Sequence, residues 1–495
     1  MSSLTCFGGV NEIGGNKILL KQGNSSVFLD FGVSYRASDQ FFDFPLLQPT
    51  NLDDLLKTGM IPRLPGLYKN AGLHPLYDPQ TGIQKLEGQT EKCEITGILL
   101  THAHQDHYGY LGVVRPDIPI FVSAVTKKML KLRNTVGGDF RDTLRETSVQ
   151  STPEATDFKV GDFRVKRFTV DHSVPGASAF LIYTDSGTVC YTGDLRFHGS
   201  NGKLTVEFLE ALKKEKPKYL LCEGTRIPSN SEPNTDETES KVLRSEKDVA
   251  SKCIDLIKSE KGLVIYDASP ADVGRLMVLH EVAKQTNRRL VLDAKLAYFA
   301  LFMNAGEPTQ LLEGLPQPTE IEVLLGRRKL ASNTKKFKSL STEDIYVETF
   351  DDGRESHERD LIGLMAGKVK WGPGRDDFLA KPGDYILYTS NGPLTTLHLL
   401  PDMRPIGGLY IYGKAEPFTE EMEFSFARLL NWLKLASLRL EYAHTSGHIF
   451  PDDLARFLAE VQASVVIPIH TLNPTAFEKM TPKVLIPEQS KEINL

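Results

Sequence analysis

The sequence is poor in cysteine and in long apolar runs, and each shortage excludes a class of protein. Only 5 of the 495 residues are cysteine, an odd number scattered along the chain, which argues against a disulfide framework. No apolar run reaches the roughly 18 residues of a membrane-spanning helix, and residues 1–15 lack the charged start and apolar stretch of a signal peptide. We therefore expect a cytoplasmic protein with no membrane partner.

An excess of basic charge is also absent, because the formal net charge is −6 at pH 7. Binding to a polyanion would therefore depend on local clusters of Lys and Arg rather than on the total charge. The hydrophobic share of 40% is enough for substantial cores. At about 100–200 residues per domain, the length predicts two to four domains of a globular protein.

The strongest positive feature is the segment HAHQDH at residues 102–107, which directly follows an apolar strand expected at 98–101. Imidazole nitrogen and carboxylate oxygen are donors that suit Zn²⁺, and a strand-end loop can aim two side chains at one metal and two at another. A solvated turn that happens to be rich in histidine is a poor alternative at this spacing. The candidate ligands are His102, His104, Asp106 and His107.

Three further donors stand at the ends of β-rich runs. The run 164–170 ends in a turn that carries His172, which taken alone would more often be a hydrogen-bonded turn histidine. The run 188–192 leads to Asp194, whose two carboxylate oxygens could bridge two ions, and the run 464–469 ends at His470. These separate segments all supply donors for the same metal chemistry.

These motifs resemble the metallo-β-lactamase superfamily, in which strand-end loops of a four-layer αββα sandwich carry a binuclear zinc site. By this resemblance, Asp30 matches the first motif and lies behind the metal loop, where it orients the ligands. A plain buried aspartate that stabilises a turn is the alternative for Asp30. One zinc would be held by His102, His104, His172 and Asp194, and the other by Asp106, His107, Asp194 and His470.

The separation between Asp194 and His470 is too long for a loop and predicts an inserted domain. The strand ends at Glu223 and at the histidine pair His444 and His448 resemble motifs A and B of the β-CASP nucleases, and His470 resembles their motif C. The start at residues 8–16 is similar to that of ribonuclease J. We expect a first metallo-β-lactamase part at 1–222, a β-CASP-like insert at 223–384 and a second metallo-β-lactamase part at 385–495.

Within the insert, apolar strands alternate with amphipathic helices, which predicts a parallel sheet with helices packed on it. A helix expected to begin after Ser269 could hold an RNA phosphate at its first turn, together with Arg275, although an ordinary capped helix is the better interpretation. Basic residues that could bind RNA are Arg327, Arg328 and Lys329, and a further cluster runs from Lys127 to Arg133. An ordinary solvated face is the alternative for each cluster.

The resemblance implies a zinc-dependent ribonuclease that hydrolyses single-stranded RNA with a metal-bound hydroxide, in exonucleolytic or endonucleolytic mode. It implies two Zn²⁺ per chain, with Mn²⁺ as a substitute. Asp106 would accept the proton of the nucleophile, His448 would stabilise the phosphorane or protonate the leaving oxygen, and Glu223 would orient a histidine. The role of His444 and a homo-oligomeric state stay open.

Three alternatives remain at this point. A DNA nuclease of the same family is opposed mainly by His470, because the RNA-cutting members are associated with histidine at motif C. A hydrolase of a small ester, thioester or lactam would have little use for Glu223, His448 and the insert. An inactive RNA-binding subunit would be expected to have broken ligand motifs. The region 35–93 is expected to be a partly irregular insertion near the active-site rim.

Overall fold

The structure, a computed structural model, describes residues 2–42, 47–69, 76–78, 82–84, 93–137, 141–228, 243–269, 272–304, 310–324, 356–364, 370–371, 380–390, 392, 405–414 and 420–495. The chain forms two units, each with its own internal contacts. The first comprises Met1–Asp236 together with Gly447–Leu495, and the second is Glu237–Ser446.

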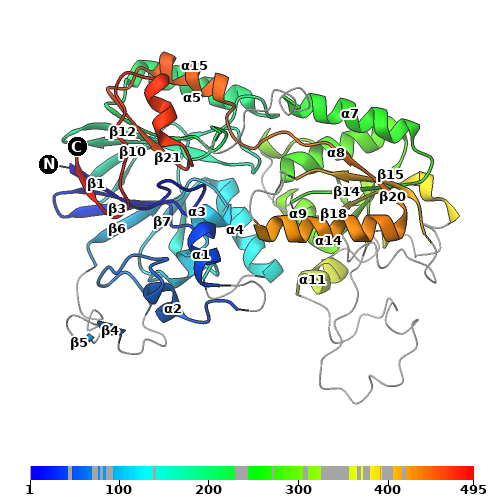
Figure 1. Ribbon diagram of the computed structural model, residues 1–495, viewed down its shortest axis with the longest axis horizontal. Coiled ribbons are helices and arrows are strands. Elements are labelled where there is room, and N and C mark those ends of the chain that lie inside the picture. Colours follow the sequence, from blue (N-terminus) through cyan, green and yellow to red (C-terminus); the bar gives the residue numbers. More distant parts are fainter. Residues whose placement is uncertain are drawn as a thin grey trace. The chain divides into compact units, whose positions relative to one another are not determined.

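Two β-sheets form the centre of the first unit (Figure 1). One sheet has the order β22 (Glu492–Asn494), β1 (Ser2–Gly8), β2 (Lys17–Gln22), β3 (Ser25–Leu29), β6 (Ile95–Leu99), β7 (Ile120–Val122) and β8 (Val149–Ser151). The other has the order β21 (Val465–Ile469), β13 (Tyr219–Glu223), β12 (Gly187–Tyr191), β11 (Ser178–Thr184), β10 (Phe163–Thr169) and β9 (Asp157–Val160).

The two sheets pack face to face because successive side chains of a strand point to opposite faces. In β11, Phe180 and Ile182 join the core between the sheets, with Leu20 and Leu29 of the other sheet. The alternate residues of β11 join a second core on the opposite face, against Phe208 and other helical residues. The sheet containing β11 is therefore apolar on both faces, as the inner layer of a multilayer sandwich must be.

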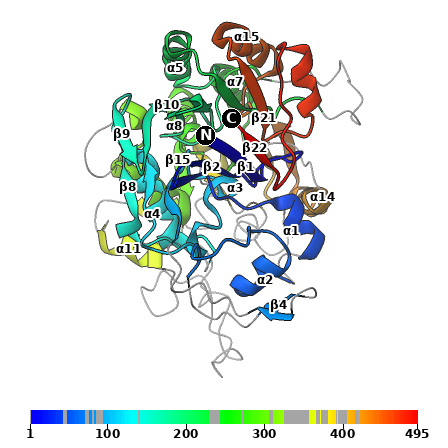
Figure 2. The same cartoon turned by 90° about the vertical axis from the view of Figure 1, so that its left-hand side faces the viewer.

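Helices cover the outer faces of both sheets and complete four layers. Helices α5 (Gly202–Glu215) and α15 (Pro451–Val461) lie over the sheet that contains β11. Leu209 of α5 and Phe457 of α15 belong to the core on the outer face of this sheet. Helices α3 (Gln105–Tyr108) and α4 (Ala124–Gly137) lie on the other side of the sandwich (Figures 1 and 2). This confirms the expected αββα arrangement.

The second unit contains one sheet whose neighbouring strands are all parallel. Its order is β17 (Lys370–Trp371), β16 (Ile321–Leu324), β15 (Arg289–Asp293), β18 (Tyr385–Thr389), β14 (Leu263–Asp267), β19 (Gly408–Tyr412) and β20 (Leu438–Tyr442). Its helices are α7 (Glu246–Ser259), α8 (Val273–Thr286), α9 (Ala294–Asn304), α11 (Ser356–Leu364) and α14 (Glu420–Ala436). The predicted parallel sheet with attached helices is therefore present.

The predicted return to the first domain at residue 385 is wrong. Strand β18 lies between β15 and β14 in the middle of the parallel sheet, and β20 is an edge strand of the same sheet. The chain re-enters the first unit only at Gly447. An apolar pattern does not tell which sheet a buried strand joins, since that depends on long-range pairing.

The region 35–93 is more regular than expected where the structure describes it. It contains α1 (Tyr35–Phe41), α2 (Leu52–Lys57) and a hairpin of β4 (Leu76–Asp78) and β5 (Gly82–Gln84). Leu55 and Met60 are buried, so part of this region belongs to the folded unit. Short 3₁₀ turns complete the described elements, at Leu111–Val113, Glu146–Ser148, Gln310–Leu312, Pro318–Glu320, Pro382–Asp384 and Pro474–Lys479.

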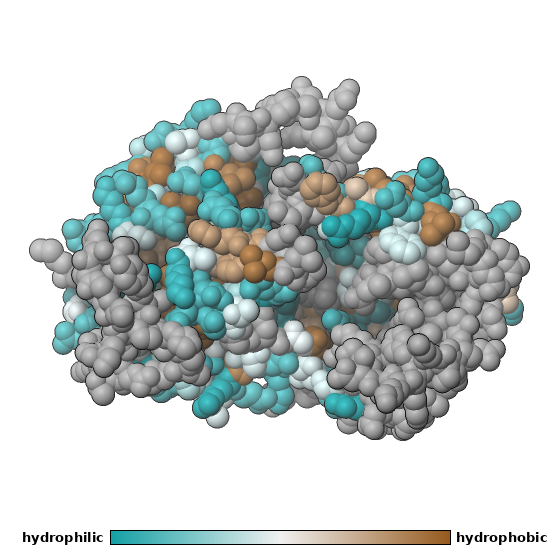
Figure 3. Space-filling model, turned by 60° about the horizontal axis from the view of Figure 1, so that its bottom comes forward, coloured by the Kyte–Doolittle hydropathy of each residue, from teal (hydrophilic) through white to brown (hydrophobic). Residues whose placement is uncertain are grey.

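Surface hydrophobicity is dispersed on the face shown in Figure 3. Over its described residues, hydrophobic side chains lie in small groups among hydrophilic ones. Among the helices that the structure describes, none combines the length and the apolar character needed to cross a membrane.

Candidate metal centre

The histidine-rich segment lies where β6 ends and α3 begins, close against the N-terminal loops of the first unit. The amide of Phe31 donates to the carbonyl of His107 at 2.7 Å, and the amide of Asn16 donates to the carbonyl of Asp106 at 3.2 Å. A Cβ atom on Gly32 would lie 1.7 Å from the Asp106 carbonyl oxygen, and Gly14 has φ +80. Only glycine allows the backbone to approach the ligand loop so closely.

The predicted ligands form two groups whose donor atoms lie within 4.8 Å of one another. His102, His104 and His172 meet Asp194 in the first group. The second group contains three donors, Asp106, His107 and His470. Side chains that are up to 368 residues apart in the chain, from 102 to 470, thus converge at the strand ends of both sheets.

Asp194 stands between the two groups. Its Oδ2 lies 3.1 Å from His107 Nε2 and 3.7 Å from His470 Nε2 on one side. On the other side the same oxygen lies 3.7 Å from His102 Nε2 and 3.8 Å from His172 Nε2. One oxygen of Asp194 thus faces imidazole nitrogens of both groups, and its role as a bridging ligand stays a prediction.

The donor set fits a divalent cation. Both carboxylate oxygens of Asp194 and Nε2 of His107 are buried without a hydrogen bond of good geometry among the described residues, although Asp194 Oδ2 lies 3.1 Å from His107 Nε2. Buried polar atoms are rarely left in this state because their desolvation costs about 1–3 kcal/mol each. These three atoms belong to residues that are predicted to bind metal. Imidazole together with carboxylate is a typical donor set for zinc.

Partners behind the ligands orient the imidazole rings. Asp30 Oδ2 lies 2.7 Å from His107 Nδ1 and accepts from the Tyr191 hydroxyl at 2.6 Å, and the carboxylate also accepts from the Thr101 amide. The Nδ1 atom of His172 lies 2.5 Å from the Gly447 carbonyl oxygen. Because a carbonyl can only accept, His172 carries its proton on Nδ1 and presents the lone pair of Nε2 to the metal group.

Burial and the neighbouring charges keep His102, His104, His172 and Asp194 in their metal-binding forms, whereas the carboxylates around His107 outweigh its burial and raise its pKa well above the ordinary range. Burial and adjacent imidazoles hold the pKa values of His102 and His172 well below their ordinary range. Burial lowers the pKa of His104 to about 4, opposed by Asp106 and assisted by the charge of Arg133. Burial opposes ionisation of Asp194, but His107 and His470 outweigh it and hold its pKa well below normal.

His448 lies beside the metal groups and is held by Glu223. Its Nδ1 lies 3.1 Å from Glu223 Oε2 and 3.7 Å from Asp194 Oδ2. Glu223 is fully buried, and its Oε1 also accepts from the amide of Leu195 at 2.9 Å. Burial works against the imidazolium, yet Glu223 and Asp194 raise the pKa of His448 to about 9. Glu223 therefore lies where it can orient the imidazole, and this orienting role stays a prediction.

Two residues of the first unit that sequence reasoning missed also tie the ligand loops together. The Nε of Arg196 lies 3.1 Å from Asp171 Oδ2, and both side chains are buried. Asp171 directly precedes His172, and Arg196 follows Asp194 by two residues. Charged residues beside two ligand motifs were the available signal, but pairing between them is visible only in the folded chain.

The predicted phosphate contact at Arg275 is wrong. The side chain of Arg275 is fully buried in the second unit and pairs with Glu246 at 3.1 Å. Its guanidinium also donates to the Tyr266 hydroxyl at 2.7 Å and to the Ala443 carbonyl at 3.1 Å. Helix α8 begins at Val273 with Asp272 as its cap, so Ser269 precedes the helix by several residues. Arg327, Arg328 and Lys329 lie outside the described residues.

We expect Arg275 to matter for stability. Replacing it with methionine leaves Glu246 buried without its cation, which for a broken buried pair costs about 3–5 kcal/mol. Denaturant unfolding should show this loss in the transition of the second unit. Lys284→Met is the control, since the Lys284 side chain is 52% exposed and should change stability little. Unchanged stability of the Arg275 variant would contradict the structural role.

His444 does not join the metal groups. Its Nδ1 lies 3.1 Å from the Gly413 carbonyl oxygen, and both residues belong to the second unit. The sequence left the role of His444 open, and the structure shows a hydrogen bond of its ring within the second unit.

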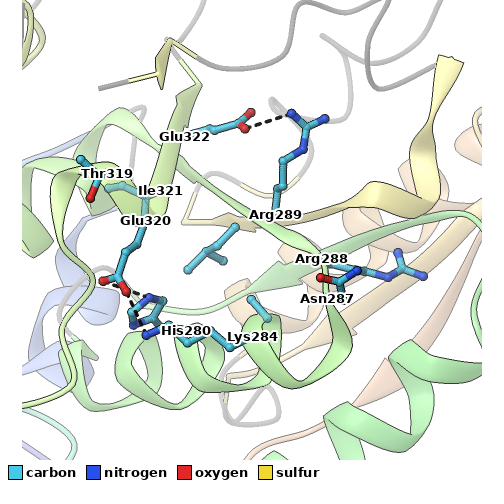
Figure 4. A pocket seen from close by; sticks show the side chains of 11 residues that line it. His280, Lys284, Asn287, Arg288, Arg289, Thr319, Glu320, Ile321 and Glu322 are labelled. Atoms are coloured by element: carbon cyan, nitrogen blue, oxygen red, sulfur yellow. Dashed lines mark hydrogen bonds and ion pairs between the residues drawn. The ribbon is translucent and has the colours of Figure 1, made fainter. Parts of the chain in front are cut away.

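A cavity of about 320 Å³ in the second unit offers no second centre of this kind (Figure 4). It lies between the end of α8 and the starts of β15 and β16. Lys284 pairs there with Glu320 at 3.0 Å, and Arg289 pairs with Glu322 at 3.2 Å. Arg288 donates to backbone carbonyls, including Gly262 at 2.8 Å. The cationic side chains that line this cavity are thus already engaged.

Comparison with known proteins supports the fold. The family model of the metallo-beta-lactamase superfamily matches residues 76–240, which include the histidine-rich segment, His172 and Asp194. Ribonuclease J of Sinorhizobium meliloti is 28% identical over 207 residues, which cover 41% of this chain and 34% of the relative. Ribonuclease J of Mycobacterium tuberculosis is 26% identical over 296 residues, or 58% of this chain and 43% of the relative.

Other matches extend over more of the chain. Ribonuclease J of Mycoplasma genitalium is 21% identical over 481 residues, or 95% of this chain and 68% of the relative. A crystal structure of a protein of unknown function from Enterococcus faecalis V583 superposes with a TM-score of 0.68 at 23% identity, covering 100% of both chains. This chain thus spans less than half the length of the first two relatives, and the likeness to the solved structure concerns the fold.

Proposed function

We propose that the chain, which matches the metallo-beta-lactamase superfamily model over residues 76–240 and is similar to ribonuclease J, is a metal-dependent ribonuclease of that superfamily. The observation that carries the proposal is the two ligand groups with the Asp194 carboxylate between them, and the His448 and Glu223 pair beside them. Zinc is the proposed ion, two per chain, because imidazole and carboxylate donors predominate. We also propose that the second unit corresponds to the β-CASP insert.

The proposed reaction is hydrolysis of a phosphodiester bond. When bound, divalent ions supply a water that is deprotonated near neutral pH and positive charge beside the scissile phosphate. Asp106 would accept a proton from the attacking water, since its Oδ2 stands at the edge of the second group, 3.2 Å from His470 Nε2. His448 would donate a proton to the leaving ribose oxygen, with Glu223 fixing the ring.

The pair formed by Glu223 and His448 favours a nuclease over a hydrolase of small esters or lactams. Cleavage of a phosphodiester leaves an alkoxide that needs a proton, and an oriented imidazole next to both metal groups can supply one. Single-stranded RNA is the preferred substrate because relatives of this chain, from Mycobacterium tuberculosis and Mycoplasma genitalium, are named ribonuclease J. A DNA nuclease is the second candidate, since this donor set would act on either backbone.

The proposal is tested with end-labelled single-stranded RNA and DNA of one sequence, each with a 5′ monophosphate, triphosphate or hydroxyl. Cleavage of RNA that stops with a strong chelator and returns with Zn²⁺ or Mn²⁺ supports the proposal. The pattern of products separates stepwise trimming from internal cuts. Preferential cleavage of DNA would replace RNA as the substrate, and chelator-resistant activity would rule out the metal centre.

We propose that Arg133 of α4 contacts an RNA phosphate. Its guanidinium carbon lies 5.7 Å from the ring centre of Tyr108, the residue after His107, and its buried Nε has no hydrogen-bond partner among the described residues. Arg133→Met is expected to weaken RNA binding and to reduce the slope of log affinity against log salt by about 0.7, the value for one phosphate contact on a single strand.

The control for Arg133 is Arg164→Met. Arg164 also stacks on a tyrosine, Tyr183, at 3.7 Å, but it is paired with Asp157 at 3.1 Å. Its loss should leave the salt dependence of RNA binding unchanged. Equal salt slopes for wild type and the Arg133 variant would show that this arginine does not touch the RNA backbone.

A further inference from the structure

Thr225 lies at the turn that follows β13, two residues after Glu223. A Cβ atom on Gly224 would come within 2.7 Å of the Phe477 ring, so the small residue lets the chain pass close to the core and turn there. The amide of Ile227 donates to the Gly224 carbonyl at 3.1 Å and closes the turn. The Thr225 side chain is thereby directed toward His470 and Glu223.

The hydroxyl of Thr225 bridges these two side chains. Its Oγ1 lies 2.7 Å from Glu223 Oε2 and 2.8 Å from His470 Nδ1, with the His470 carbonyl oxygen farther away at 3.3 Å. A hydroxyl has one hydrogen, and a carboxylate is the stronger acceptor because it is charged. The hydrogen of Thr225 therefore goes to Glu223, and the hydroxyl oxygen accepts from the Nδ1–H of His470.

This direction of hydrogen bonding determines the tautomer of His470. With the proton on Nδ1, the lone pair of Nε2 faces Asp106 Oδ2 at 3.2 Å and Asp194 Oδ2 at 3.7 Å, within the second ligand group. The backbone of His470 adds to the constraint. It has φ 53, in the left-handed region, and its amide donates to the Gly9 carbonyl at 2.8 Å.

We propose that Thr225 is a positioning residue that links the metal ligand His470 to Glu223, and through Glu223 to His448. The buried carboxylate of Glu223 then orients both His470, a ligand of the second group, and His448, the proposed proton donor. The inference rests on the proposed function, because it assigns Thr225 a role in that same centre. It predicts that loss of the Thr225 hydroxyl affects the second group and leaves the first intact.

The test compares Thr225→Val with Thr225→Ser. Valine keeps the shape and removes the oxygen, whereas serine keeps the hydroxyl. In chelator competition without RNA, the valine variant should bind one of its two zinc ions about 10–100-fold more weakly, and the other ion as tightly as wild type. The serine variant should bind both ions within a few-fold of wild type.

A second measurement reads the tautomer directly in metal-free protein. Ring ¹⁵N shifts of His470, assigned by comparison with His470→Gln, should show a proton on Nδ1 in wild type and in Thr225→Ser. In Thr225→Val the two tautomers should mix. Thr184→Val is the matched control, because its hydroxyl donates to the Gly187 carbonyl at 2.6 Å in the same unit, and it should change neither measurement.

Unchanged affinity for both ions and an unchanged His470 tautomer in Thr225→Val would overturn the proposal. Failure of Thr225→Ser to restore the wild-type tautomer would do the same, because it would show that the hydroxyl is not the cause. If wild type binds no zinc, the proposed metal centre fails. The tautomer of the metal-free protein still tests the hydrogen-bond relay in that case.

Discussion

Replacing Asp194 with asparagine is expected to remove both divalent ions and to lower RNA cleavage by more than about 1,000-fold. The reason is the position of its carboxylate, 3.1–3.8 Å from imidazole nitrogens of both ligand groups. Asparagine has nearly the same shape as aspartate but carries no charge, so it should bind the ions far more weakly. Each ion stabilises the charge of the transition state by several kcal/mol, and a loss of about 1.36 kcal/mol slows the reaction tenfold. Elemental analysis after dialysis measures the loss of metal.

Two comparisons test the bridging role of Asp194. His104→Ala and His470→Ala should each lose one ion, because the proposed assignment gives each of these residues to a single ion. Asp185→Asn is the control, since Asp185 is exposed in the turn between β11 and β12 and should keep both ions. An Asp194 variant that retains two ions would show that the two groups do not depend on a shared carboxylate.

His448→Ala is expected to lower kcat by about 10²–10⁴-fold while the metal content stays near that of wild type. The imidazole is held by Glu223 at 3.1 Å and is 21% exposed, so it can reach a substrate beside the buried ligands. Single-turnover cleavage at saturating RNA separates this effect from RNA binding. Glu223→Gln should reproduce part of the loss, because it weakens the bond that orients the ring.

His444→Ala is the matched control for His448. It removes a histidine four positions earlier whose Nδ1 lies against the Gly413 carbonyl, and it should leave kcat within a few-fold of wild type. A large loss of zinc in His448→Ala would mean that this residue is a metal ligand. That outcome is a real alternative, because the donor atoms of Asp194, Glu223, His448 and His470 also lie within 4.8 Å of one another.

The strand ends and their ligands were predictable from the sequence because both are local. Apolar runs followed by a turn placed His172, Asp194 and His470 correctly after β10, β12 and β21. Parallel strands bring their carboxyl ends to one edge, so donors that follow such strands meet there. The partner of Glu223 was likewise predicted to be a histidine, from the resemblance rather than from spacing.

The wrong predictions concern long-range contacts. Arg275 stands three residues into α8 and is typical of a phosphate contact, yet the fold buries it against Glu246. Residue 385 was expected to begin the second metallo-β-lactamase part, but strand β18 lies between β14 and β15 through pairing across more than 90 residues. Local patterns carry no information on either choice.

By itself, the sequence determined which residues could bind metal, because imidazoles and carboxylates at strand ends are a local property of the chain. Only the tertiary structure decided how they act together. Asp194 serves two groups, and Thr225 joins His470 to Glu223, since the sandwich brings β12, β13 and β21 side by side. A hydrogen bond 2.8 Å long between residues 225 and 470 has no trace in the sequence, because its geometry exists only once the sheet has formed.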